Sequence, residues 1–188
     1  SKTVDDPGDK KVIANTTPRF RYGIAADAAW KGFDLRIFLQ GVGKRDYVPG
    51  AGATFFWGAT GDSHYSVCFE EHWDFFRPEG DPLGANLNAY YPRPLFNWDY
   101  KNQNLQSRYV QSAAYLRLKN IQLGYTLPKS LITKAGLQSV RFFISGENLL
   151  TFTKLAGMFD PETIDGAMND GMVYPLNKTI SIGFNLNF

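Results

Sequence analysis

The sequence has one cysteine, two histidines and no long uninterrupted run of apolar residues. The single thiol, Cys68, cannot form a disulfide within the chain, and no second thiol offers a metal pair. No apolar stretch approaches the roughly 18 residues that a membrane-spanning helix needs. This excludes a helical membrane protein, but it does not exclude a β-barrel, whose strands each give a much weaker signal.

An excess of charge of one sign is also missing. Twenty Lys and Arg residues stand against 18 Asp and Glu residues, which gives a net charge of +2. No polybasic surface for nucleic acid is therefore expected. The chain begins at Ser1 with no Met, no charged leader and no apolar leader. We recognise no targeting signal in it, so we expect a mature protein or a fragment.

Aromatic residues, by contrast, are abundant. The chain has 15 Phe, 10 Tyr and 4 Trp, together with 18 Gly and 10 Pro that lie mostly between apolar runs. This composition favours many strands and turns over long helices.

Five segments alternate apolar and polar side chains, as strands do. The expected strands cover about 19–30, 33–43, 115–127, 139–153 and 177–188. In the third segment, Leu116 and Leu118 are one residue out of phase with Ile121. Either the strand leaves the apolar environment near its start, or a β-bulge near Lys119 and Asn120 resets the register, and we favour the bulge.

The connections between these segments alternate in length. Lys31–Gly32 and 128–138 are short, whereas 44–113 and 154–176 are long. Outer-membrane barrels have short periplasmic turns and long external loops, and a soluble sandwich has no reason to sort its loops in this way. The residues after Pro128 predict one or two helical turns closed by Gly136. The 44–113 segment is too long for an ordinary connection, so it should be functional or packed.

Five strands cannot close a spanning barrel. An open sheet in lipid would leave about ten unpaired N–H and C=O groups on each edge, at several kcal/mol each. That cost of tens of kcal/mol exceeds the whole stability of a typical domain, about 5–15 kcal/mol. We therefore expect further strands, on missing sequence or on another chain.

Several motifs resemble a known family. They are Trp30–Leu35, Gln40–Gly43, Asn88–Arg93, Tyr115–Pro128 (YLRLKNIQLGYTLP), Ser145–Thr153, Phe159–Glu162 (FDPE) and the aromatic last residue, Phe188. In this order they are similar to the C-terminal part of the SusC/RagA-like TonB-linked outer-membrane proteins of Bacteroidetes. The segment 73–87 departs from the pattern of that family.

The resemblance implies an all-β fold in which this chain supplies five or so C-terminal antiparallel strands of a transmembrane barrel of about 22 strands. It also implies import of glycan or peptide oligomers across the bacterial outer membrane, driven through TonB, with a SusD-like surface lipoprotein as lid. The chain would form part of the barrel wall, which contacts lipid, and it would also form external loops. The plug in the lumen and the segment that contacts TonB would lie elsewhere.

The sequence offers little that resembles a catalytic or metal site. His64 and His72 lie near Glu70, Glu71 and Asp74 without the spacing of a fixed metal site. The acidic residues between 160 and 170 do not have the spacing of a calcium-binding EF-hand. Ser63 is merely adjacent to His64. We expect no catalytic residue, no metal and no cofactor, and the protein is not expected to be an enzyme.

Two sets of residues are candidates for contact with partners. Aromatic residues of the long loop could touch substrate or the lid, although packing within the loop is the simpler interpretation: Trp57, Trp73, Phe75, Tyr90 and Tyr91. The last strand could be the signal read by the barrel-assembly machinery, or could simply close the barrel, through Ile182, Phe184, Leu186 and Phe188.

Two alternatives remain open from the sequence. One is a soluble extracellular β-domain that binds carbohydrate through its aromatic residues. The other is a split transporter whose barrel is completed by a second polypeptide.

Overall fold

The computed structural model describes residues 8, 11–50, 53–61, 67–95, 102–164 and 173–188. The chain divides into two compact units. The sheet unit consists of Pro18–Lys44, Ala114–Thr153 and Leu176–Phe188. The loop unit consists of Ser1–Thr17, Arg45–Ala113 and Lys154–Pro175.

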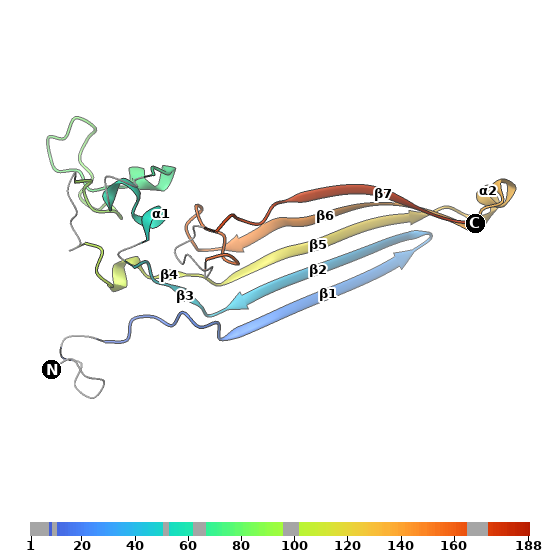
Figure 1. Ribbon diagram of the computed structural model, residues 1–188, viewed down its shortest axis with the longest axis horizontal. Coiled ribbons are helices and arrows are strands. Elements are labelled where there is room, and N and C mark those ends of the chain that lie inside the picture. Colours follow the sequence, from blue (N-terminus) through green and yellow to red (C-terminus); the bar gives the residue numbers. More distant parts are fainter. Residues whose placement is uncertain (1–7, 9–10, 51–52, 62–66, 96–101, 165–172) are drawn as a thin grey trace. The chain divides into compact units, whose positions relative to one another are not determined.

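The sheet unit is a single five-stranded antiparallel sheet (Figure 1). Its strands, in spatial order, are β1 (Phe20–Trp30), β2 (Phe33–Gly43), β5 (Tyr115–Thr126), β6 (Ser139–Thr153) and β7 (Thr179–Asn187). This confirms the all-β class and the antiparallel arrangement. Neither β1 nor β7 pairs on its outer side with another described strand.

Both short connections have the backbone that their residues favour. Lys31 (φ 46°) and Gly32 (φ 90°) form the two-residue turn between β1 and β2, and two successive positive φ values match the right-handed twist of a hairpin. Between β5 and β6, α2 (Lys129–Ile132) and the 3-10 turn η4 (Thr133–Ala135) end at Gly136 (φ 71°). The predicted helical turns and their glycine stop are confirmed.

The predicted bulge lies in β5. Against β2, the pairing passes from Phe38↔Asn120 to Leu39↔Leu118, which leaves Lys119 as the extra residue. The pairing of β5 with β6 shifts at the same place. The extra residue brings Leu118 onto the same face as Ile121, because side chains alternate along a strand.

The loop unit is built from short elements joined by turns. They are β3 (Asp46–Tyr47), which pairs with β4 (Gln111–Ser112), the single helical turn α1 (Thr54–Trp57), and the 3-10 turns η1 (Gly58–Thr60), η2 (Glu70–Trp73) and η3 (Ser107–Tyr109). Throughout the described ranges, no helix has the length and apolar character needed to cross a membrane.

Candidate functional site

One face of the sheet carries a row of aromatic side chains that crosses all five strands. Trp30 pairs with Phe33, Phe33 with Tyr125, Tyr125 with Phe142, and Phe142 with Phe184. The row lies at the end of the sheet that holds the Lys31–Gly32 turn. Aromatic girdles of this kind mark the bilayer interface in transmembrane barrels.

The rows beyond the aromatic row are mainly aliphatic. The next row runs across the sheet through Ala28, Leu35, Leu123, Ile144 and Ile182. Aromatic residues return on this face at Tyr22 and Phe152, in a row that also holds Gly41 and Leu116. From Tyr22 to Trp30 the distance along β1 is about 26 Å at 3.3 Å per residue.

This apolar face is uncovered. Ile24, Leu123, Ile144 and Phe184 are all exposed, and the Ile182 side chain is 83% exposed. A soluble sheet would bury such a face against a second layer. The sequence-predicted residues of the last strand, Ile182, Phe184, Leu186 and Phe188, belong to this uncovered surface.

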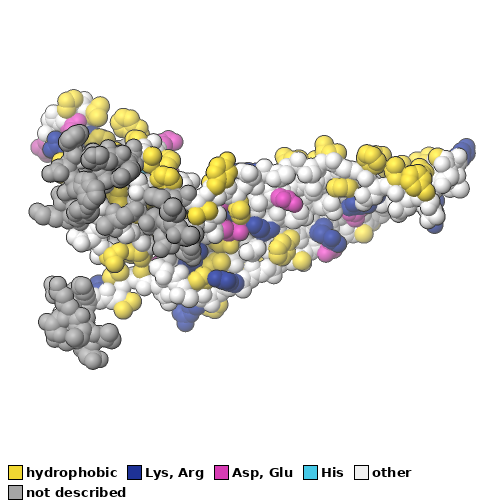
Figure 2. All heavy atoms as spheres, in the orientation of Figure 1, with side chains coloured by type: hydrophobic (Ala, Val, Ile, Leu, Met, Phe, Trp, Pro, Cys, Tyr) yellow, Lys and Arg dark blue, Asp and Glu magenta, His cyan; other side chains and the backbone are white. Residues whose placement is uncertain are grey.

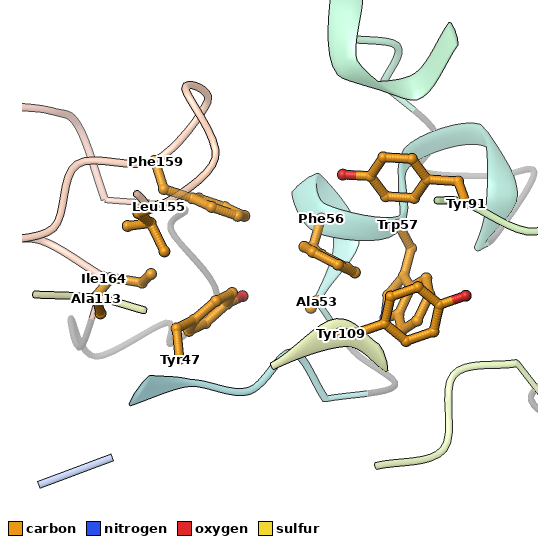
Figure 3. Packing of buried hydrophobic residues seen from close by; sticks show 10 residues of the cluster. All are labelled: Tyr47, Ala53, Phe56, Trp57, Tyr91, Tyr109, Ala113, Leu155, Phe159 and Ile164. Atoms are coloured by element: carbon orange, nitrogen blue, oxygen red, sulfur yellow. The ribbon is translucent and has the colours of Figure 1, made fainter. Parts of the chain in front are cut away.

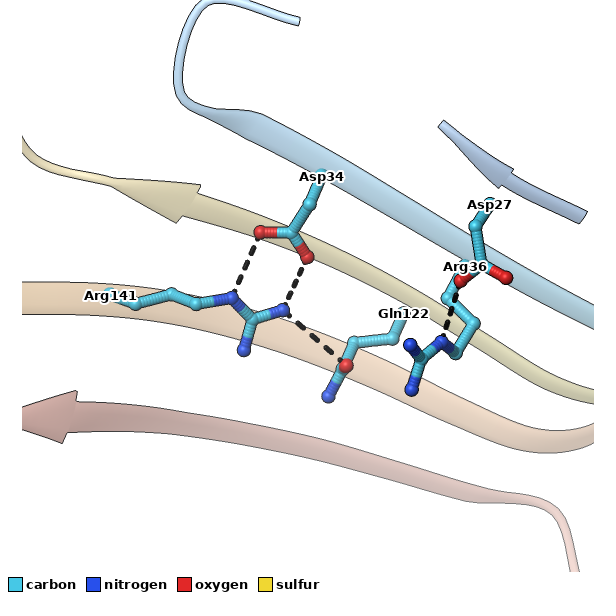
Figure 4. A network of polar contacts seen from close by, with 5 residues as sticks. All are labelled: Asp27, Asp34, Arg36, Gln122 and Arg141. Carbon is cyan, nitrogen blue, oxygen red and sulfur yellow. Dashed lines mark hydrogen bonds and ion pairs between the residues drawn. The ribbon is translucent and has the colours of Figure 1, made fainter. Parts of the chain in front are cut away.

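The opposite face of the sheet carries charged side chains (Figure 2), which form ion pairs (Figure 4). The Arg141 guanidinium on β6 donates through Nε to Asp34 Oδ1 on β2 at 2.9 Å and through Nη2 to Asp34 Oδ2. Nη2 also lies 3.4 Å from Gln122 Oε1. Arg36 pairs with Asp27 across the β1–β2 hairpin at 2.7 Å. These five charged and amide side chains therefore share the face opposite the apolar one.

The Arg141 side chain crosses β5 to reach Asp34. Gly124 leaves room for it because glycine has no side chain. Gly124 pairs with Asp34 on one side and with Phe143 on the other. A Cβ atom there would lie 2.5 Å from Asp34 Oδ1 and would also collide with the guanidinium. This cross-strand pair was not foreseen from the sequence, because it depends on the register of three strands.

The loop unit has an aromatic core centred on Phe56 (Figure 3). The Phe56 ring lies 4.9 Å from the Trp57 ring and 5.8 Å from the Tyr109 ring, both edge-on. Such edge-to-face pairs are favoured by the charge distribution of aromatic rings. The buried cluster also includes Tyr47, Ala53, Tyr91, Ala113, Leu155, Phe159 and Ile164. The long connection 44–113 therefore packs around a hydrophobic core.

The aromatic residues proposed as contact residues fall into two groups. Trp57, 1% exposed, and Tyr91 are enclosed in the core, and Trp57 Nε1 donates to Gly50 O at 2.7 Å. These two side chains pack the loop unit, and Tyr91 also lines a hollow at its surface. Trp73 is 61% exposed, whereas Phe75 and Tyr90 are half-buried against the core. Trp73, Phe75 and Tyr90 are thus the more accessible members of the set.

His72 supports the core of the loop unit. Its Nδ1 accepts from the Phe69 N–H at 3.0 Å, so Nε2 carries the proton and donates to Phe56 O at 3.0 Å. His64 lies outside the described residues. Within the part of the chain that the structure describes, no group of His, Cys, Asp and Glu could hold a metal ion.

The pKa values of three tyrosines of the loop unit are shifted in the same direction. Burial raises the pKa of Tyr91 well above its ordinary value, and it also raises the pKa of Tyr90 and of Tyr109. Loss of water around a phenolate disfavours the charged form. These three phenols therefore remain neutral at physiological pH.

Comparison with protein-family models finds no match. TonB-dependent receptor P3 of Formosa agariphila is 32% identical over 96% of this chain, and TonB-dependent receptor P26 of the same organism is 30% identical over 96%. The chain spans only 17% and 18% of the length of those two proteins.

Solved structures of similar fold include the RagAB peptide transporter, with a TM-score of 0.69 and 24% identity over 94% of this chain. The RagAB peptide importer in its open-open state gives a TM-score of 0.66 and 23% identity over 95% of this chain. In both cases the match covers 18% of the other chain.

The relatives and the fold agree with the motifs. TonB-dependent receptors are outer-membrane proteins, so the expected location in the bacterial outer membrane is confirmed. The chain therefore belongs to the TonB-dependent receptors, shares its fold with the RagAB structures, and spans part of the length of such a receptor.

Proposed function

We propose that this chain forms barrel wall and external loops of a non-enzymatic outer-membrane importer of nutrient oligomers, glycans or peptides, powered through TonB. The single observation that carries the proposal is the uncovered apolar face of the sheet, bordered by its aromatic row. The names of the relatives, TonB-dependent receptors and a peptide importer, support the same function.

The strand lengths support a membrane-spanning role. β1 and β2 each have 11 residues, and a tilted transmembrane strand needs about 9–11. In this proposal the apolar face touches acyl chains, and the face with the Arg141–Asp34 and Arg36–Asp27 pairs faces the lumen. The reverse orientation would place charges in lipid at a cost of about 2–4 kcal/mol for each Arg near the midplane.

The proposal assigns partners to the remaining surfaces. The outer edges of β1 and β7 pair with the other strands of the barrel, because unpaired edges are not tolerated in lipid. The loops 44–113 and 154–176 are extracellular and lie under a SusD-like lipoprotein. The plug and the segment that contacts TonB are outside this chain, which is the C-terminal segment of the barrel. The barrel-assembly machinery reads β7 and Phe188.

The competing function is a soluble extracellular domain that binds carbohydrate, and the exposed Trp73 is the observation in its favour. The apolar face argues against it, since soluble monomers rarely expose apolar patches larger than a few hundred Å².

Two adjacent substitutions in β7 test the proposal. Ile182→Arg places a charge on the apolar face, and Ser181→Arg places the same charge on the opposite face. In the full-length receptor, Ile182→Arg should sharply lower the amount of folded protein in the outer membrane, whereas Ser181→Arg should assemble normally. Equal assembly of the two variants would contradict a lipid-facing wall. A soluble domain would instead tolerate Ile182→Arg.

A further inference from the structure

We propose that the loop unit contains a binding site for a carboxylate group of the imported oligomer, in a hollow lined in part by Arg93 and Arg108. This inference rests on the proposed import function and specifies the substrate chemistry of one site. The hollow measures about 390 Å³ and is formed by residues from two stretches, 76–93 and 102–109.

The charge of the hollow is positive. Its lining includes two arginines and, among the described residues, no Asp or Glu. Arg108 donates through Nε to Tyr90 O at 3.3 Å and through Nη2 to Ala89 O. These neutral acceptors fix the guanidinium without cancelling its charge.

Asp74, a carboxylate on the neighbouring segment, is already engaged. Asp74 accepts from Asn86 Nδ2 at 2.9 Å and from the Tyr90 N–H at 3.1 Å. These bonds fasten Asp74 to its own surroundings, outside the lining of the hollow. Within the described ranges neither Arg93 nor Arg108 forms an ion pair, so their positive charge is available to a ligand.

The rest of the lining offers apolar and amide surface. Phe76 and Leu87 are exposed apolar side chains. The Tyr90 ring is held at 5.0 Å from Tyr91 and 5.4 Å from Tyr109, and Gln111 Nε2 donates to its hydroxyl at 3.2 Å. Since burial raises the pKa of Tyr90, its phenol adds no negative charge to the hollow at physiological pH.

This combination fits a carboxylate next to an apolar surface. A guanidinium presents its N–H donors as a planar fork that matches a carboxylate, and charge-assisted hydrogen bonds of this kind are stronger than neutral ones. The apolar wall suits either the aliphatic part of an acidic peptide or the ring face of a uronic acid sugar. Both ligands present the same chemistry to the arginines.

The test uses the full-length receptor that carries this chain, purified in detergent, with direct binding measurements. The probes are a short glutamate-containing peptide, its glutamine counterpart, an oligogalacturonate and the matching neutral galactose oligomer. The two acidic probes distinguish a peptide source of the carboxylate from a sugar source. Wild-type receptor should bind one acidic probe at least about tenfold more tightly than its neutral counterpart.

Substitutions assign that preference to the hollow. Arg93 is exposed, so Arg93→Gln spares the core. This variant should remove most of the preference, and Arg93→Gln combined with Arg108→Gln should remove it. The matched control is Arg77→Gln, because Arg77 also donates to two backbone carbonyls, Gly84 O and Trp73 O, but lies outside the lining. The control should keep the preference.

Two results would overturn the site. Equal binding of acidic and neutral probes by wild type, or a preference unchanged by Arg93→Gln, would reject it while the receptor still imports oligomers. If the receptor bound no oligomer and cells carrying it took none up, both this site and the proposed function would fail. If the double variant misfolds, the Arg93→Gln result alone decides whether the hollow binds the carboxylate.

Discussion

At the scale of single residues, Gly124 leaves the space that an ion pair between β2 and β6 needs. The Arg141 side chain passes over this position to reach Asp34, and an added Cβ would occupy that path. The absent side chain thereby permits an ion pair between strands that are not neighbours in the sheet.

We predict that Gly124→Ala destabilises the receptor by about 1–3 kcal/mol, the usual cost of inserting an atom into filled space. Thermal unfolding in detergent would measure the loss. The control is Gly43→Ala, where the nearest atoms are 3.7 Å away. In an Arg141→Gln background the cost of Gly124→Ala should shrink, since the two positions share one interaction. An unchanged cost there would separate the glycine from the ion pair.

Trp57 and Trp73 form a second matched pair, one enclosed and one exposed. Trp57→Ala should cost the loop unit about 3–5 kcal/mol, because it leaves a cavity in the aromatic core. Trp73→Ala should change stability by less than about 0.5 kcal/mol. Hydrogen exchange of the loop unit would measure both. If ligand affinity is also unchanged in a folded Trp73→Ala receptor, substrate contact by Trp73 is ruled out.

Residues differ in how far the sequence predicts their roles. Ile182 and Phe184 were assigned to one face because alternation along a strand is local information. Trp57 and Tyr91 belong to the same aromatic-rich stretch as Trp73, and nothing local separates buried from exposed members. Trp57 is buried against Tyr109, and Tyr91 is buried against Phe56, so both depend on partners that are distant in the chain.

At the scale of elements, the β5 bulge sets which side chains face outward. Lys119 is the extra residue, and without it the segment Tyr115–Leu118 would turn over, because a one-residue slip exchanges the two faces of a strand. The phase shift in the sequence was compatible with two interpretations, and the pairing of β5 with β2 confirms the favoured one, the bulge.

Deleting Lys119 should therefore place Leu116 and Leu118 on the polar face and Arg117 on the apolar face. We expect a strong loss of folded receptor in the outer membrane. Lys119→Ala keeps the backbone bulge and should assemble. Immunoblots that compare heated and unheated membrane samples would separate folded from unfolded protein. Normal assembly of the deletion variant would show that the bulge does not fix the register.

The elements of the loop unit should also respond to alkaline pH. Tyr90, Tyr91 and Tyr109 have raised pKa values, so the folded unit keeps protons that the unfolded chain releases near pH 10. The stability of the unit is thus intact below about pH 10 and falls as pH rises further. Protease resistance and tyrosinate absorbance, followed against pH, would test this. Ionisation of all three near pH 10 with no loss of resistance would refute it.

The short elements of the loop unit were largely beyond sequence reasoning. β3 and β4 are two residues each, and they pair across more than 60 intervening residues. Strands of that length leave no periodic signal, whereas the sheet strands have 9 to 15 residues and repeat their two-residue pattern several times. The hollow with Arg93 and Arg108 likewise exists only once these distant turns have packed together.

At the scale of the whole molecule, the last strand gives the clearest prediction. β7 is an edge strand of the described sheet, and Phe188 follows it with an exposed side chain. If the assembly machinery reads this strand, removal of Phe188 should lower the amount of receptor in the outer membrane, whereas Phe188→Tyr, which keeps the aromatic ring, should not. Quantitative mass spectrometry of purified outer membranes would measure the difference. Normal amounts after removal of Phe188 would contradict the signal role.

The make-up of the loop core has a consequence for biogenesis. Tyr47 and Phe56 come before β5 in the chain, whereas Leu155, Phe159 and Ile164 come after β6. A nascent polypeptide that stops within β6 lacks the second group and leaves the rings of the first group open to water. Incomplete molecules would thus expose hydrophobic surface. Chaperones or proteases of the cell envelope would recognise that surface.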